Sequence, residues 1–151
     1  MPMRPVELSF KRWLDSKNYP YLCIDNSIDT MPEFFRGITK RPDFLLVIKH
    51  LGIIAIDVKE GEPYRGQDFV LDEKEEVIKY LQFERIMRLP VWFVFGSQNY
   101  QYSTWYWIPL SKVLECELRA SSRTGDRFRA IPPSACIALQ ADRDGISRII
   151  D

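Results

Sequence analysis

Cysteine and histidine are scarce in this sequence of 151 residues, which limits the metal and catalytic sites it can build. Its three cysteines, Cys23, Cys116 and Cys136, are odd in number and show no CxxC spacing. That pattern argues against a cysteine zinc site and indicates reduced thiols in a cytoplasmic protein. The one histidine, His50, stands in a short break between two apolar runs, so we expect it at a turn or on the surface and not as a catalytic base.

Long apolar runs and an excess of charge are also missing. No run approaches the length of about 18 residues that a membrane-spanning helix needs. The first residues include Arg4, Glu7, Lys11 and Arg12 and lack the apolar stretch of a signal peptide, so we expect a cytoplasmic protein with no membrane partner. Lysine and arginine together number 21, as do aspartate and glutamate. This balance argues against strongly basic, non-specific binding to nucleic acid and leaves a local basic patch open.

The residues that are present fit a globular protein with a substantial core, since 46% are hydrophobic and 28% charged. The length suits one domain over 1–151 and is short for two. Two apolar runs, 44–48 and 53–58, are the central feature of the sequence and flank a break at 49–52. Both runs are rich in β-branched or large apolar residues and too short for separate helices. They predict an antiparallel hairpin.

Two charged residues end the second of these runs. Because side chains alternate along a strand, Asp57 and Lys59 share one face and apolar residues 54, 56 and 58 share the other. A carboxylate and an ammonium at the end of a buried strand are costly unless each has a partner. They form either a structural ion pair or half of a metal-dependent active site.

Apolar spacing and turn residues predict the remaining elements. One tryptophan of the strand over 102–110 is expected near the surface, with core packing favoured over base stacking. The tail after Asp142 is expected to be peripheral. The predicted elements are helices over 5–16, 73–89 and, capped by Ser111, 111–118; strands over 19–24, 91–95, 102–110 and 135–139; and loops over 25–41 (with a helical turn at 33–36), 60–72 and 119–129.

Several other charged residues allow both a functional and a structural interpretation. Glu7 lies beside the apolar stripe of the first helix, so it either faces a site or favourably occupies a helix N-terminus. Two basic groups occupy predicted loops and are either solvated or contact phosphates. They are Arg36, Lys40 and Arg41 before the hairpin, and Arg119, Arg123, Arg127 and Arg129 late in the chain.

The order helix, three strands, helix, strand carries a short motif. Pro42 and Asp43 open the second strand, 13 residues follow, and Asp57-x-Lys59 ends the third. In this arrangement the chain resembles the PD-(D/E)XK nuclease superfamily. Glu7 matches the first-helix acid of several branches, including archaeal Holliday-junction resolvases. The resemblance covers residues 4–96, with 97–151 as an extension.

The resemblance implies an α/β, restriction-endonuclease-like fold: a mixed central sheet flanked by helices, with an αβββαβ core and extra C-terminal strands. It also implies Mg²⁺ or Mn²⁺ held by Asp43, Asp57, Glu7 and the carbonyl of Val58, with Lys59 assisting the attacking water. The chemistry agrees, because phosphodiester hydrolysis needs an activated water and stabilised phosphate charge, and hard cations prefer carboxylate oxygens. A nearby lysine would orient or deprotonate the water and offset phosphate charge.

Three hypotheses follow from these observations. The first is a metal-dependent endonuclease acting on branched or duplex DNA, with RNA left open and a homodimer allowed. The second is a catalytically inactive module of the same fold that binds nucleic acid or a protein partner. The third is an interaction domain without nucleic acid, in which Asp57 and Lys59 form a structural pair.

Overall fold

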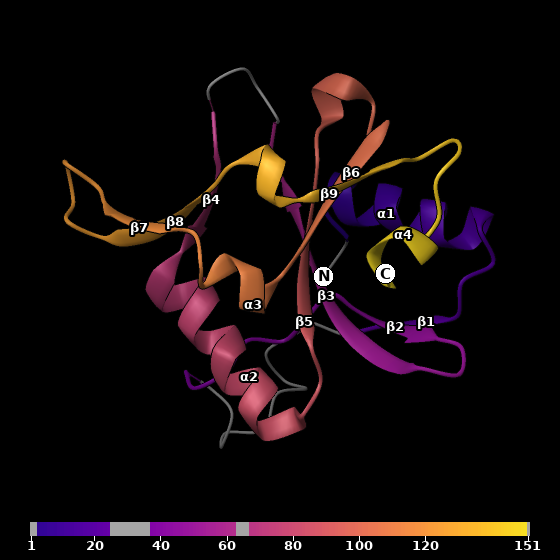
Figure 1. Ribbon diagram of the computed structural model, residues 1–151, viewed down its shortest axis with the longest axis horizontal. Coiled ribbons are helices and arrows are strands. Elements are labelled where there is room, and N and C mark those ends of the chain that lie inside the picture. Colours follow the sequence, from indigo (N-terminus) through magenta and orange to yellow (C-terminus); the bar gives the residue numbers. More distant parts are fainter. Residues whose placement is uncertain (1–2, 25–36, 63–66, 151) are drawn as a thin grey trace.

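The computed structural model describes residues 3–24, 37–62 and 67–150, and its main feature is a six-stranded mixed sheet (Figure 1). Its strands run in the order β1-β2-β3-β5-β6-β9. Only the β3–β5 pair is parallel; the other neighbours are antiparallel. The strands are β1 (Tyr21–Cys23), β2 (Phe44–Ile48), β3 (Gly52–Glu60), β5 (Val91–Gly96), β6 (Thr104–Pro109) and β9 (Ile137–Gln140).

A smaller sheet and several helices complete the described part of the chain. The smaller sheet has the order β4-β8-β7, formed by β4 (Phe69–Asp72), β8 (Arg127–Ile131) and β7 (Glu117–Ala120). None of the described helices is both long and apolar enough to cross a bilayer. The helical segments are α1 (Pro5–Ser16), the π-helical η3 (Glu73–Ile78), α2 (Lys79–Met87), η4 (Gln98–Tyr100), α3 (Leu110–Val113), η5 (Pro133–Ala135) and α4 (Ser147–Ile150).

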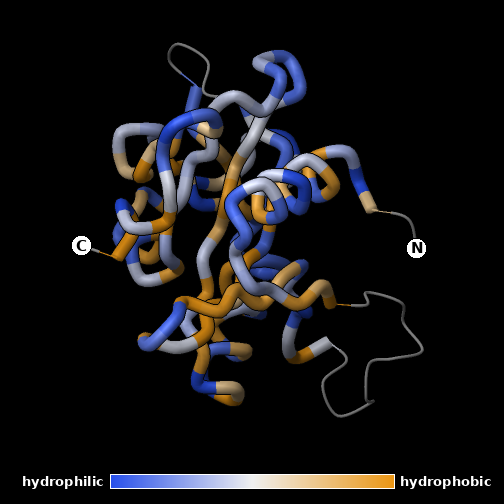
Figure 2. The backbone as a smooth tube through the Cα atoms, turned by 90° about the vertical axis from the view of Figure 1, so that its right-hand side faces the viewer, coloured by the Kyte–Doolittle hydropathy of each residue, from blue (hydrophilic) through white to orange (hydrophobic). Residues whose placement is uncertain are grey.

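Each face of the large sheet carries its own apolar cluster. One cluster joins α1 to the residues of β3 at 54, 56 and 58. The other joins Ala55 of β3 to η3, α2 and α3. Figure 2 shows the hydrophobic strand segments passing through the middle of the molecule. The two-residue alternation of β3 puts Asp57 and Lys59 on the face opposite residues 54, 56 and 58, as the sequence predicts, and this is the face that α2 covers.

The first helix and the central hairpin form where they were predicted. The helix begins at Pro5, whose missing N–H costs nothing in a first turn, and its buried residues are Val6, Phe10, Trp13 and Leu14. In the hairpin, Phe44 pairs with Ile56 and Ile48 with Gly52. His50 lies exposed in the intervening turn with φ of 68°, which confirms its predicted place.

Two predicted loops contain strands instead. Residues 69–72 form β4, and the supposed basic loop 119–129 is mostly the β7–β8 hairpin, with the turn at 121–126 between its strands. β7 is exposed along its whole length, so its sequence lacks the alternation by which a half-buried strand is recognised. Pairing with β8 holds it in place, and local composition does not encode that pairing.

The chain after residue 100 departs from prediction at three more points. Trp105 and Trp107 are both buried, because residues two apart on a strand share a face. The helix after β6 covers Leu110–Val113, and Pro109 precedes it without a capping side chain, so Ser111 is not its cap. Ile149 of α4 packs into the α1 cluster, so the tail adds to the core. The helical turn predicted at 33–36 lies outside the described residues.

The end of β5 is fitted closely to the strand beside it. A Cβ built on Gly96 would lie 2.3 Å from a ring carbon of Trp105, which is itself fully packed. Only glycine permits that approach, and it lets β5 and β6 stay paired beside the end of β3.

Candidate active site

Two buried carboxylates meet where β2 and β3 run side by side. Asp43 directly precedes β2, and its Oδ2 accepts a hydrogen bond from the Val58 N–H at 2.7 Å. Its own N–H donates to the Ile56 carbonyl at 2.9 Å. Asp43 and Asp57 are 7% and 2% exposed. The antiparallel pairing of the hairpin thus converts a separation of 13 residues in the sequence into a contact between neighbours.

Asp57 is held by partners from two elements. Its Oδ2 lies 2.9 Å from Lys59 Nζ on the same strand. Its Oδ1 lies 2.9 Å from the hydroxyl of Tyr80 on α2. That hydroxyl has one proton for two acceptors, since the Arg41 carbonyl oxygen lies 3.0 Å away. Burial, followed by the charge of Asp57, raises the pKa of Tyr80 well above its usual value, so the phenol stays a neutral donor.

Lys59 lies between Asp57 and a third acid that the helix supplies. Its ammonium donates to Oε1 of Glu76 in η3 at 2.6 Å. The ammonium of Lys40 donates to the same oxygen. Burial opposes the charge on Lys59, but Asp57 and Glu76 outweigh it and raise the pKa of Lys59 above its usual value. Lys59 is therefore a fixed cation at neutral pH.

The surroundings of Asp43 disfavour its charged form. Burial is the main reason why the pKa of Asp43 rises from 3.8 to about 8, and the nearby charge of Asp57 adds to it. The hydrogen bond from the Val58 N–H acts in the opposite direction and only partly offsets these effects. Two desolvated carboxyls side by side create a demand for a cation at this point of the sheet.

Arg4 partly meets that demand. It lies just before α1, and its Nη2 donates to the Val58 carbonyl at 2.8 Å. The same nitrogen is 3.6 Å from Asp43 Oδ2. Its Nε donates to Glu7 Oε1 at 2.5 Å. Arg4 thus links Glu7 to the Val58 carbonyl and to Asp43. The side chain of Glu7 is 12% exposed.

Two oxygens of the site are buried and make no hydrogen bond to any described residue. They are Asp57 Oδ2, whose contact with Lys59 is an ion pair, and Glu76 Oε2. Within residues 3–24, 37–62 and 67–150, no three histidine, cysteine or acidic side chains gather as a possible metal cluster. The Asp57 carboxylate and the Val58 carbonyl both lie near Asp43.

The predicted basic residues lie in different surroundings. Lys40 joins the site through Glu76, and Arg41 contributes its carbonyl to Tyr80. Arg129 is engaged internally: it forms two bonds to Glu73, at 2.9 and 3.1 Å, and donates to two carbonyls of the 114–116 segment. Arg36 lies outside the described residues.

The other three late arginines are on the β7–β8 hairpin. Arg119 lies 2.9 Å from Glu117 and 3.4 Å from Asp68. Arg123, in the turn, and Arg127, at the start of β8, are exposed, and neither forms an ion pair with any residue that the structure describes. Among the four arginines of 119–129, Arg119 and Arg129 are therefore engaged with acids, whereas Arg123 and Arg127 form no ion pair with a described residue.

Sequence reasoning did not identify Arg4, Glu76 or Tyr80 as site residues. A signal existed for two of them, because Glu76 and Tyr80 are four apart in a helical segment and so share a face. Arg4 carried no comparable signal. Its contact with Val58 spans 54 residues.

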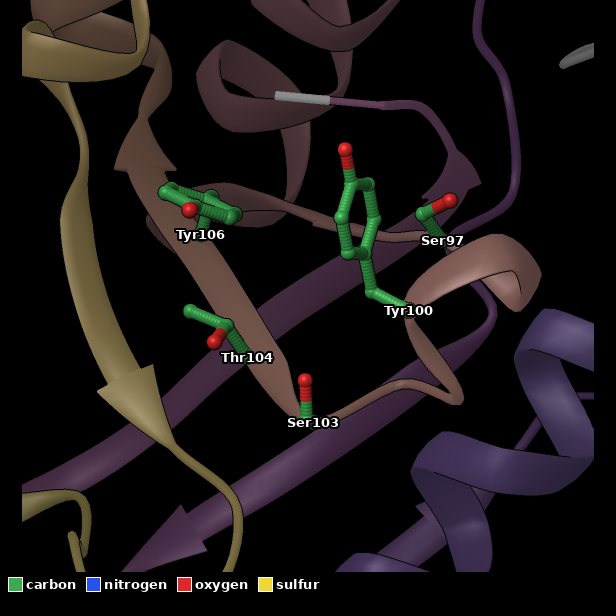
Figure 3. Close-up of a pocket in the computed structure, with 5 residues that line it drawn as sticks. All are labelled: Ser97, Tyr100, Ser103, Thr104 and Tyr106. Carbon is green, nitrogen blue, oxygen red and sulfur yellow. The ribbon is translucent and has the colours of Figure 1, made fainter. Parts of the chain in front are cut away.

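A separate pocket of about 200 Å³ is lined by hydroxyl side chains beyond the end of β5 (Figure 3). None of its lining residues is an acid or a base. The pocket thus lacks the carboxylates and the ammonium that Asp43, Asp57 and Lys59 bring together. The lining residues are Ser97, Tyr100, Ser103, Thr104 and Tyr106.

Comparison with solved structures identifies the fold as restriction-endonuclease-like, as the sequence predicts. No family model matches the sequence, and no curated protein matches it. Among solved structures, Hjc of Archaeoglobus fulgidus, a Holliday junction resolvase from an archaeal hyperthermophile, matches with a TM-score of 0.56 and 16% identity, over 89% of this chain and 93% of its own. D212, a nuclease from a fusselovirus, matches with a TM-score of 0.49 and 12% identity, over 94% and 81%.

Proposed function

We propose that this protein hydrolyses phosphodiester bonds of DNA with the help of Mg²⁺ or Mn²⁺. The supporting observation is the convergence of Asp43, Asp57 and Lys59 at one point of the sheet, with both carboxylates buried. A structural role alone would require only one acid to pair with Lys59. The second acid, Asp43, is desolvated at an unfavourable pKa, which is typical of a functional site.

The oxygen groups fit a hard cation. Asp43, Asp57 and the Val58 carbonyl would hold it, and Mg²⁺ commonly takes one or two carboxylates while keeping several waters. When bound, such an ion polarises the phosphate and lowers the pKa of an attacking water. Glu7 would support this set from α1, where it already bonds to the arginine that contacts Val58.

Lys59 acts in this proposal as a charged donor. Because Asp57 and Glu76 keep it protonated, it is unsuited to removing a proton at neutral pH. Its ammonium would instead orient the attacking water and offset phosphate charge. Glu76 positions this ammonium through the 2.6 Å hydrogen bond.

Basic side chains around the site would contact the DNA backbone. Arg123 and Arg127 are exposed and suit phosphate contacts, whereas Arg129 would contribute by anchoring the hairpin. Lys40 and Arg41 lie beside Glu76 and Tyr80, and we place the DNA near them. The match to a Holliday junction resolvase makes branched DNA the first substrate to test, with plain duplex and RNA beside it. A homodimer and a cytoplasmic location remain part of the proposal.

The test combines metal binding with cleavage. We expect wild type to bind Mn²⁺ in calorimetry and to cut a DNA four-way junction or plasmid. Asp57→Asn should lose saturable binding and at least about 100-fold in cleavage rate, because it removes a ligand charge at the reacting centre. Asp142→Asn, at an exposed position, is the matched control and should behave as wild type.

Two outcomes would contradict the proposal. Wild type that binds no Mn²⁺, even with DNA present, would leave Asp57 and Lys59 as a structural pair. Cleavage by Asp57→Asn at the wild-type rate would place the chemistry elsewhere. Thermal melting of each variant establishes that a loss of activity is not a loss of folding.

A further inference from the structure

We infer that the Arg4 guanidinium is an internal cation of the metal-free site, which competes with the metal ion for the same oxygens. This inference rests on the proposed function and concerns how that site is controlled. It starts from one geometrical fact: Arg4 contacts groups that we propose as metal ligands on two separate elements, α1 and the β2–β3 hairpin.

The contacts of Arg4 are those of a bound cation. One guanidinium nitrogen donates to the Val58 carbonyl at 2.8 Å and lies 3.6 Å from Asp43 Oδ2. Another donates to Glu7 at 2.5 Å. The Val58 carbonyl is a backbone acceptor near the end of β3, between Asp57 and Lys59. A guanidinium bonded to it occupies one of the two lone-pair directions through which this oxygen would bind a metal.

Electrostatics explain why a cation settles there. Asp43 and Asp57 are almost fully buried and close together, and Lys59 pairs with Asp57 and Glu76. The Arg4 guanidinium brings positive charge to within 3.6 Å of Asp43 Oδ2.

The Arg4 side chain is also positioned so that it can move away from these oxygens. Its side chain is 51% exposed, and its residue lies at the N-cap, ahead of the first buried position of α1. Rotation into solvent therefore breaks hydrogen bonds and leaves the packing of Val6 and Phe10 intact. A buried arginine in the same place would have closed the site permanently. The exposed Arg4 lowers the apparent metal affinity, because only the molecules in which Arg4 has left these oxygens are free to bind the ion.

The experiment measures metal affinity by titrating Mn²⁺ into the full chain in a calorimeter. Arg4→Gln should bind Mn²⁺ about fivefold to tenfold more tightly than wild type, because one charge-assisted contact no longer has to be broken. Arg4→Lys should lie between them, since an ammonium cannot span both acceptors as a guanidinium does. Arg12→Gln, an exposed arginine of the same helix, removes equal charge and should match wild type.

A second readout needs no variant. In wild type, the Nε–H of Arg4 should be protected from hydrogen exchange without metal, owing to its bond with Glu7, and should lose that protection when Mg²⁺ saturates the site. Retained protection at saturation would show that Arg4 stays in place and would overturn the inference.

The outcomes separate this inference from the proposed function. If wild type binds Mn²⁺ and Arg4→Gln binds it equally or more weakly, then Arg4 supports the carboxylates instead of competing for them. The inference then fails while the nuclease proposal stands. If neither protein binds Mn²⁺, both fail together.

Discussion

At the residue scale, Asp43 is the most informative side chain of the site, because its environment opposes its own charge. It is buried beside Asp57, and its pKa rises to about 8. In the unfolded chain the same carboxyl titrates near 3.8. Between these values the folded state binds a proton that the unfolded state has released, so the free energy of unfolding must fall as pH rises through this range.

We therefore expect the metal-free protein, kept in chelator, to lose stability between pH 4 and pH 8, with a slope approaching about 1.4 kcal/mol per pH unit from this group. Asp43→Asn should flatten that slope, because asparagine keeps an oxygen for the Val58 N–H and carries no charge at any pH. Urea unfolding at several pH values measures the effect. Asp142→Asn serves as the control, and an equal slope in wild type and Asp43→Asn would refute the shift.

At the scale of elements, the helical segment formed by η3 and α2 does more than cover the sheet. It brings Glu76 and Tyr80 onto Lys59 and Asp57 from one face. Asp72 begins the segment, with its side chain accepting the Glu75 N–H at 2.7 Å. Asp57 and Lys59 of β3 are thus held in place by Tyr80 and Glu76 of the helical segment. The position of the Lys59 ammonium depends on both elements.

Glu76→Gln should lower the cleavage rate about tenfold, because the ammonium of Lys59 loses a charge-assisted partner. Removing this negative charge should also lower the pKa of Lys59, so the alkaline end of the pH–rate profile should move to lower pH. A merely structural change would leave that profile in place. Glu75→Gln, one residue away, exposed and paired with Lys79, is the matched control.

At the scale of the whole molecule, the formal net charge is zero, so any contact with DNA depends on local groups of basic residues. The β7–β8 hairpin extends away from the large sheet in Figure 1. Arg129 ties its base to Glu73 in η3, the segment that also carries Glu76. The exposed Arg123 and Arg127, which we propose as phosphate contacts, therefore belong to a hairpin anchored to the segment that carries Glu76.

We expect the double variant Arg123→Gln/Arg127→Gln to bind DNA more weakly, and equally so for all sequences. The slope of log affinity against log salt should fall by about 2, since each phosphate contact contributes about 0.9. Fluorescence anisotropy at several salt concentrations measures this. Arg143→Gln/Arg148→Gln removes the same charge at and just before α4, and a similar loss there would show that only net charge matters.

Much of this protein could be predicted from its sequence. The apolar spacing of α1, the β2–β3 hairpin and the alternation that puts Asp57 and Lys59 on one face are all local patterns, and each appears as expected. They account for these elements, because a period of two or 3.6 residues indicates which face of a strand or helix is buried. The motif of Asp43, Asp57 and Lys59 follows from the same local information.

The tertiary structure decided what local patterns cannot encode. Arg4 reaches Val58 across 54 residues, Arg129 reaches Glu73 across 56, and the exposed β7 exists through its pairing with β8. None of these contacts has a periodic signature, since each depends on where two distant segments meet. The burial of Asp43 also depends on tertiary structure. The sequence shows that residue 43 is an acid, but only packing of the sheet removes the carboxyl from water and raises its pKa.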